Sequence, residues 1–160
     1  MGHPLMFDDD DTVLARLRRI ALDLPGSREK ITHGHPAFFT TRVFAYFGGS
    51  IKVDGTYVQH PHSVVVRPPE EERRALLEDA RCYAPAYLAP SGWVGVDVDE
   101  ETDWGEITEL VETSYRETAG RRLVAELDAP DTSPSLRAML TEVPIAGLTG
   151  TLADRFGAPA

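Results

Sequence analysis

The chain has 160 residues, 42% of them hydrophobic, which is the usual size of one domain and too apolar for a disordered chain. Its formal net charge of −10 argues against a generally basic nucleic-acid binder. No apolar run approaches the roughly 20 residues of a membrane helix, and the N-terminal residues do not have the pattern of a secretory signal, so we expect a cytoplasmic protein. Cys82 is the only cysteine, which excludes a disulfide framework.

The first predicted helix begins at Asp10 or Asp11, either of which would cap its amino end. Apolar residues then recur at helical spacing and form one buried stripe: Val13, Leu17, Ile20, Ala21 and Leu24. Pro25-Gly26 ends the helix, because proline cannot continue the hydrogen-bond ladder and glycine tolerates the turn.

Short β-rich runs follow the first helix. We expect strands at 37–40, 43–47, 51–53, 56–58 and 63–67. Thr41-Arg42 and Asp54-Gly55 are the expected hairpin turns, and Gly48-Gly49 is expected to break the second strand. Sequential strands joined by tight turns indicate an antiparallel sheet with helices on at least one face.

The rest of the chain predicts two more helices and a further strand. The second helix begins at Pro69 and ends near Asp79, and a strand follows within 92–98. Asp103 and Glu106 form an acidic variant of the capping box at the start of the third helix. We expect another helical turn or two at 121–127. The predicted fold class is therefore α+β, with a domain at 1–128 and a loosely packed or partly helical tail at 129–160.

Two histidine pairs are spaced so that each would share one face of a strand: His33 with His35, and His60 with His62. Four imidazoles would suit zinc or nickel, but no recognised ligand spacing is met, and we expect turn residues and no metal site. Cys82 lies beside a basic residue but has no assignable base, so a small buried role is expected. With no phosphate loop and no acid–base pair, we predict no cofactor and no enzymatic activity.

Aromatic residues offer a second kind of candidate site. Tyr46 and Trp93 lie in predicted strands and are expected in the core. Tyr83 and Tyr87 lie in a proline-bearing loop and are expected to be exposed. Together with His33 and His35 they are the candidates for a small-molecule pocket.

Several segments together resemble the MmcQ/YjbR-like family of small bacterial proteins. In chain order these are Leu24-Pro25-Gly26, the HGHPAF run from His33, Val43-Phe44-Ala45-Tyr46, Tyr83 with Pro85 and Tyr87, Gly92-Trp93-Val94, Asp103-Trp104 and Ser114-Tyr115-Arg116. The HGHPAF run with the later GWV is the most specific combination. The resemblance implies a frataxin-like (CyaY-like) α+β fold, and a DNA-binding role because that fold resembles a double-wing DNA-binding motif.

Two function classes stay open. The first is a non-enzymatic DNA-binding or regulatory protein that contacts phosphates weakly and salt-sensitively, with Arg16, Arg18, Arg19, Arg42, Lys52 and Arg67 as candidate residues. Basic residues outnumber acidic ones between Thr12 and Lys52, which fits either an anion-binding face or a solvated surface. The second is a module for a small molecule or a protein partner near Tyr83 and Tyr87, which the acidic net charge favours. No membrane partner is expected.

Overall fold

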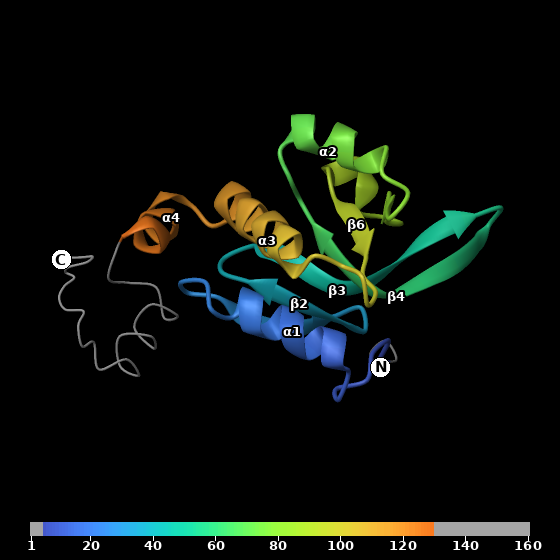
Figure 1. Ribbon diagram of the computed structural model, residues 1–160, viewed down its shortest axis with the longest axis horizontal. Coiled ribbons are helices and arrows are strands. Elements are labelled where there is room, and N and C mark those ends of the chain that lie inside the picture. Colours follow the sequence, from blue (N-terminus) through green and yellow to red (C-terminus); the bar gives the residue numbers. More distant parts are fainter. Residues whose placement is uncertain (1–4, 130–160) are drawn as a thin grey trace.

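A computed structural model of the chain describes residues 5–129. Six strands form one antiparallel sheet in the order β1-β2-β3-β4-β6-β5 (Figure 1). The strands are β1 Arg28–Thr32, β2 His35–Phe39, β3 Val43–Val53, β4 Thr56–Val66, β5 Cys82–Tyr83 and β6 Val94–Asp97. The helices are α1 Thr12–Ala21, α2 Glu70–Leu77, α3 Trp104–Thr118 and α4 Arg121–Asp128, with a 3-10 turn η1 at Ala89–Ser91. The predicted α+β class is confirmed, whereas the predicted tail lies outside the described residues beyond Ala129.

Helices α1 and α3 pack on one face of the sheet and form the main core with it (Figure 1). The helices contribute fully buried side chains that include Leu14, Leu17, Ile107, Val111 and Tyr115. The sheet contributes Phe38, Phe44, Phe47, Val64, Val66, Val94 and Val96. Burying one side chain of this size stabilises a fold by about 1.5–3 kcal/mol, so this layer supplies most of the stabilisation.

The opposite face of the sheet carries a smaller buried group. The register aligns Ala37, Tyr46, Val65, Gly95 and Tyr83 across neighbouring strands on this face. Trp93 is only 8% exposed and packs against Tyr46 at 5.2 Å between ring centroids, which confirms its predicted place in the interior. The segment between β5 and β6 crosses this face, where the amide of Ala86 donates to the carbonyl of Ser50.

Several parts of the sheet differ from the sequence expectations. The strands expected at 56–58 and 63–67 form one strand, β4, so His60 and His62 lie in a strand and not in a turn, and β5 was not expected. Strand β1 was not expected, because its first three residues are all charged and Ile31 is its one apolar residue, a composition typical of an exposed edge strand. The expected break at Gly48-Gly49 is wrong, since β3 runs on to Val53 across a bulge between Phe47 and Gly49. Gly48 has a φ of +83°, so glycine supplies the backbone freedom that the bulge requires.

Asp11, the residue that caps α1, also forms a hydrogen bond with the sheet. Asp11, one of the two expected caps, accepts hydrogen bonds through Oδ1 from the amides of Val13 (2.8 Å) and Leu14 (3.2 Å). Its Oδ2 accepts from Nε2 of His62 on β4 at 2.6 Å. Burial alone would raise the pKa of Asp11, but these hydrogen bonds outweigh burial and hold that pKa below its ordinary value of 3.8.

Replacing Asp11 with alanine should lower the free energy of unfolding by about 1–2 kcal/mol, because the cap and the contact with β4 are both lost. The contribution of the carboxylate is present above the pKa of the unfolded chain and disappears as the pH falls through the lower folded pKa, so the loss should shrink below pH 3.8. Urea titrations between pH 7 and pH 3 measure this. Asp11→Asn, which keeps a capping oxygen, is the matched control, and an equal loss in both variants at pH 7 would exclude the cap as the cause.

Candidate functional site

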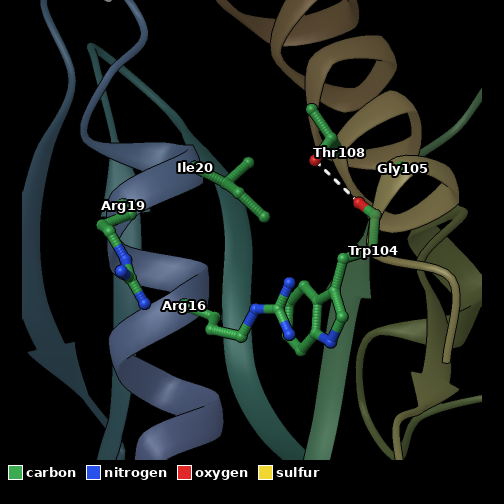
Figure 2. A pocket seen from close by; sticks show the side chains of 6 residues that line it. All are labelled: Arg16, Arg19, Ile20, Trp104, Gly105 and Thr108. Atoms are coloured by element: carbon green, nitrogen blue, oxygen red, sulfur yellow. Dashed lines mark hydrogen bonds between the residues drawn. The ribbon is translucent and has the colours of Figure 1, made fainter. Parts of the chain in front are cut away.

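A groove of about 580 Å³ lies between α1 and α3, and its lining is both basic and aromatic (Figure 2). The residues that line it are Arg16, Arg19, Ile20, Trp104, Gly105 and Thr108. Helix α1 buries Leu14, Leu17 and Ala21, and its helical period therefore leaves Arg16 and Arg19 exposed. The groove thus follows from the amphipathic pattern of α1 and from the way α3 packs beside it.

The other wall of the groove is the first turn of α3. Asp103 caps this helix by accepting a hydrogen bond from the amide of Gly105 at 2.9 Å. The hydroxyl of Thr108 donates to the carbonyl of Trp104 at 2.8 Å, as Figure 2 shows. The expected capping box is not formed, because the side chain of Asp103 accepts from Gly105, the amide of Glu106 donates to the backbone carbonyl of Asp103, and the carboxylate of Glu106 pairs with Arg81 at 3.2 Å. These contacts fix the position from which the indole of Trp104 faces α1.

Arg16 bridges the two walls. Its guanidinium carbon lies 4.6 Å from the ring centroid of Trp104, so the cation rests on the indole face (Figure 2). Such a contact is worth about 0.5–1 kcal/mol at an exposed site. Stacking occupies the face of the guanidinium and leaves its N–H groups along the edge available to an acceptor. The indole therefore fixes the orientation of the Arg16 guanidinium.

The three arginines of α1 differ in their partners. Arg18 pairs with Asp9 at 2.8 Å and with Glu29 at 2.9 Å. In the part of the chain that the structure describes, neither Arg16 nor Arg19 has a carboxylate partner. Arginine is suited to carboxylate and phosphate because its planar fork can donate two parallel hydrogen bonds. The groove can therefore hold an anion.

The other predicted nucleic-acid residues lie elsewhere. Arg42 donates to the carbonyl of Thr118 at 3.1 Å, and Arg67 donates to the carbonyl of Ser91 at 2.9 Å. Lys52 lies in the β3–β4 hairpin, with its ammonium 5.6 Å from the ring of Tyr57. Of the six predicted residues, the structure brings Arg16 and Arg19 together in the groove. Trp104 was not assigned to a site from the sequence, where it is marked by its place directly after the cap of α3 and by the Asp103-Trp104 segment of the family resemblance.

The residues predicted to line a pocket have other roles. Tyr83 is 6% exposed beneath the ring of His60, so the expectation that it is exposed is wrong, whereas Tyr87 is 82% exposed as expected. His33 lies in the turn before β2 with a φ of +52°. His35 makes a hydrogen bond through Nδ1 with the carbonyl of Phe47 at 3.1 Å, and burial lowers the pKa of this imidazole.

Metal and thiol chemistry find little support in the described residues. Within 5–129, no group of three or more histidine, cysteine, aspartate or glutamate side chains could hold a metal ion. His60 and His62 pair with Asp97 and Asp11 instead. Burial raises the pKa of Cys82 to about 11, so its thiol stays protonated and weakly nucleophilic at neutral pH.

Among residues 5–129, none of the helices combines the length and the apolar character that crossing a membrane requires.

Comparison with known proteins identifies the family. A family model described as YjbR matches residues 22–117. The chain belongs to the YjbR family. The match includes Trp104 and all of α3 except its last residue, whereas Arg16 and Arg19 precede the match, so family membership by itself says nothing about these two arginines.

A solved structure is similar in fold to this YjbR chain. The crystal structure of the Deinococcus radiodurans protein DR2400, whose domain is described as DUF419, matches with a TM-score of 0.50 and 17% sequence identity. The match covers 74% of this chain and 90% of that chain. At this identity the likeness concerns the fold alone. No significant match was found among the curated proteins.

Proposed function

We propose that this YjbR protein is a non-enzymatic binding protein that holds a small organic anion, carrying a phosphate or carboxylate group, in the groove between α1 and α3. The observation that carries the proposal is the pair of arginines, Arg16 and Arg19, left without carboxylate partners among the described residues of a chain with net charge −10. Acidic side chains are abundant here, so two adjacent unpaired guanidiniums form a local site for an external anion.

The chemistry of the lining favours binding over catalysis. Its one hydroxyl, that of Thr108, donates to a backbone carbonyl, and the remaining groups are the two guanidiniums, the indole and apolar surface. Guanidiniums do not lose their proton in the physiological range and therefore hold charge without acting as a general base. A ligand with an aromatic ring next to its anionic group would use both the arginines and Trp104.

DNA is a second candidate ligand, suggested by the fold resemblance and favoured by the exposure of both arginines on the surface of α1. Backbone phosphates would reach the same two guanidiniums, and such binding would weaken steeply with salt. The positions of Arg42, Lys52 and Arg67, away from the groove, limit the number of phosphates that one duplex could contact.

Adenosine monophosphate, which joins a phosphate to an aromatic base, should change the tryptophan fluorescence on binding in the groove, whereas adenosine should not. Arg16→Gln and Arg19→Gln should each weaken this binding about tenfold or more, since a hydrogen bond to a charged group is worth about 1.5–3 kcal/mol. Arg122→Gln is the matched control, because it removes the same charge from α4, where Arg122 pairs with Glu126.

A parallel titration with labelled duplex DNA distinguishes the second candidate. Anisotropy measured at about 20 mM and about 150 mM salt should show saturable, salt-sensitive binding only when DNA is a ligand. If adenosine monophosphate, inorganic phosphate and DNA all fail to bind, or if both groove variants bind like the control, the groove is not an anion site.

A further inference from the structure

The hairpin of β3 and β4 extends beyond the sheet (Figure 1). Strand β2 pairs with β3 only as far as Tyr46, and β6 pairs with β4 only from Ser63 onward. Between these limits, from Gly49↔His60 to Val53↔Thr56, no third strand of the described sheet pairs with β3 or β4, although the amide of Ala86 donates to the carbonyl of Ser50 on β3. We call this two-stranded ribbon, residues 49–60, the arm.

The outer edge of β4 in the arm lacks the features that usually protect an edge strand. Its residues Thr56, Tyr57, Val58 and Gln59 carry no charge and are all exposed. In the described part of the chain, their backbone groups pair only with β3. Strand β1, at the edge of the sheet, presents Arg28, Glu29 and Lys30 instead. Charged side chains discourage pairing with another chain, so the arm is the less protected of these two edges.

One face of the arm, next to this edge, carries exposed apolar side chains. Ile51 pairs with Val58 and Val53 with Thr56, so these four side chains share one face of the arm. Val53 and Val58 are 46% and 45% exposed, although side chains of this kind are usually covered. A two-stranded ribbon with one apolar face is marginally stable alone and gains stability when a further strand extends it in the same plane.

Aromatic contacts hold the arm in its extended position. Tyr57 stacks on Tyr87 with ring centroids 5.8 Å apart, and their hydroxyl groups are hydrogen-bonded. Tyr87 has a φ of +68°, which is unfavourable for a bulky side chain, and it is 82% exposed. This strained residue therefore supports the arm from outside the core.

We propose that two copies of this chain associate through the arm, with the outer edges of Thr56–Gln59 pairing as antiparallel strands about a two-fold axis. Antiparallel pairing of a strand with its own copy satisfies that symmetry. The arm carries one lysine, Lys52, and one aspartate, Asp54, so two arms do not repel each other, whereas two chains of net charge −10 do. The arm reaches roughly 15 Å, about twice the Debye length at physiological salt, and so separates the acidic bodies.

Sedimentation velocity of the full chain from about 10 μM to about 1 mM tests this pairing, since so small an interface should be weak. The wild type should shift from monomer to dimer with concentration. Val58→Lys and Gln59→Lys, both at exposed positions, should weaken the dimer at least tenfold and keep the melting temperature. Ile31→Lys, at a 52% exposed position on the β1 edge, is the matched control and should dimerise like the wild type.

Three results would overturn the pairing. One is a wild-type chain that stays monomeric to about 1 mM at physiological salt. Another is unchanged dimerisation in both arm variants. The third is loss of the dimer in the Ile31 variant alone, which would move the contact to β1. The groove proposal is unaffected by any of these, because Arg16 and Arg19 lie outside the arm.

Discussion

Replacing Ser114 with alanine is expected to lower the free energy of unfolding by about 3 kcal/mol, because one buried and one partly buried backbone group lose their side-chain partner. Ser114 is fully buried on α3, and its Oγ donates to the carbonyl of Phe44 at 2.6 Å. The same oxygen accepts from the amide of Arg67 at 2.8 Å. One hydroxyl therefore joins α3 to both β3 and the end of β4. Urea unfolding followed by circular dichroism measures the loss.

Thr113→Ala is the matched control for this substitution. Thr113 precedes Ser114 on the same helix and is partly exposed, so its loss should change the free energy of unfolding by less than about 0.5 kcal/mol. If Ser114→Ala were no more destabilising than Thr113→Ala, water would have to reach both backbone groups. The bridge between α3 and the sheet would then contribute little to the fold.

The segments that carry the family resemblance are joined to one another in the fold. Tyr115 donates from its hydroxyl to the carbonyl of Pro25 at 2.6 Å, which links the segment after α1 to α3. Ser114 links the same part of α3 to Phe44 in β3. Trp93 packs against Tyr46 of that strand. These short motifs therefore describe contacts that hold the sheet and helices together, which is why they indicate the fold and leave the ligand open.

Much of the fold could be predicted because its signals are local. The cap at Asp103 and the Asp54-Gly55 turn depend on residues close in sequence, and the structure has both. The predicted stripe of α1 is confirmed at Leu17 and Ala21, but it missed the fully buried Leu14, and the helix ends at Ala21 and not at Pro25-Gly26. The groove could not be predicted in this way. Arg16 meets Trp104 only because α1 and α3 lie side by side on the sheet, and no spacing in the sequence expresses that contact.

The burial of Tyr83 was not predicted because it depends on a glycine in the neighbouring strand. The prolines after it suggest an exposed loop, but the ring is buried against Gly95 of the neighbouring strand. Its hydroxyl makes a 2.7 Å hydrogen bond with Ser63, and the ring of His60 stacks on it at 4.0 Å between centroids. The space for this ring exists because residue 95 has no Cβ, a property visible only once the two strands are paired.

Gly95→Ala should therefore lower the free energy of unfolding by about 3–4 kcal/mol, comparable to removing a large buried aromatic side chain. A Cβ at this position would lie 2.2 Å from Cζ of Tyr83, and β6 is held between β4 and β5, so the ring would have to leave its site. Gly105→Ala, which brings a Cβ near only the carboxylate of Asp103, should be close to neutral.

A double-mutant cycle that combines Gly95→Ala with Tyr83→Ala tests whether the ring of Tyr83 causes the lower free energy of unfolding of the Gly95 variant. Tyr83→Ala alone should destabilise the chain by about 3 kcal/mol, since it removes a buried ring and the hydrogen bond of its hydroxyl with Ser63. With the ring gone, adding Gly95→Ala should cost less than about 1 kcal/mol, because the three atoms nearest to the new methyl group all belong to that ring and alanine restricts the unfolded chain. Urea titrations of the four chains give the coupling energy. Additive losses would mean that the ring does not rest on Gly95, and the buried position of Tyr83 would have to be abandoned.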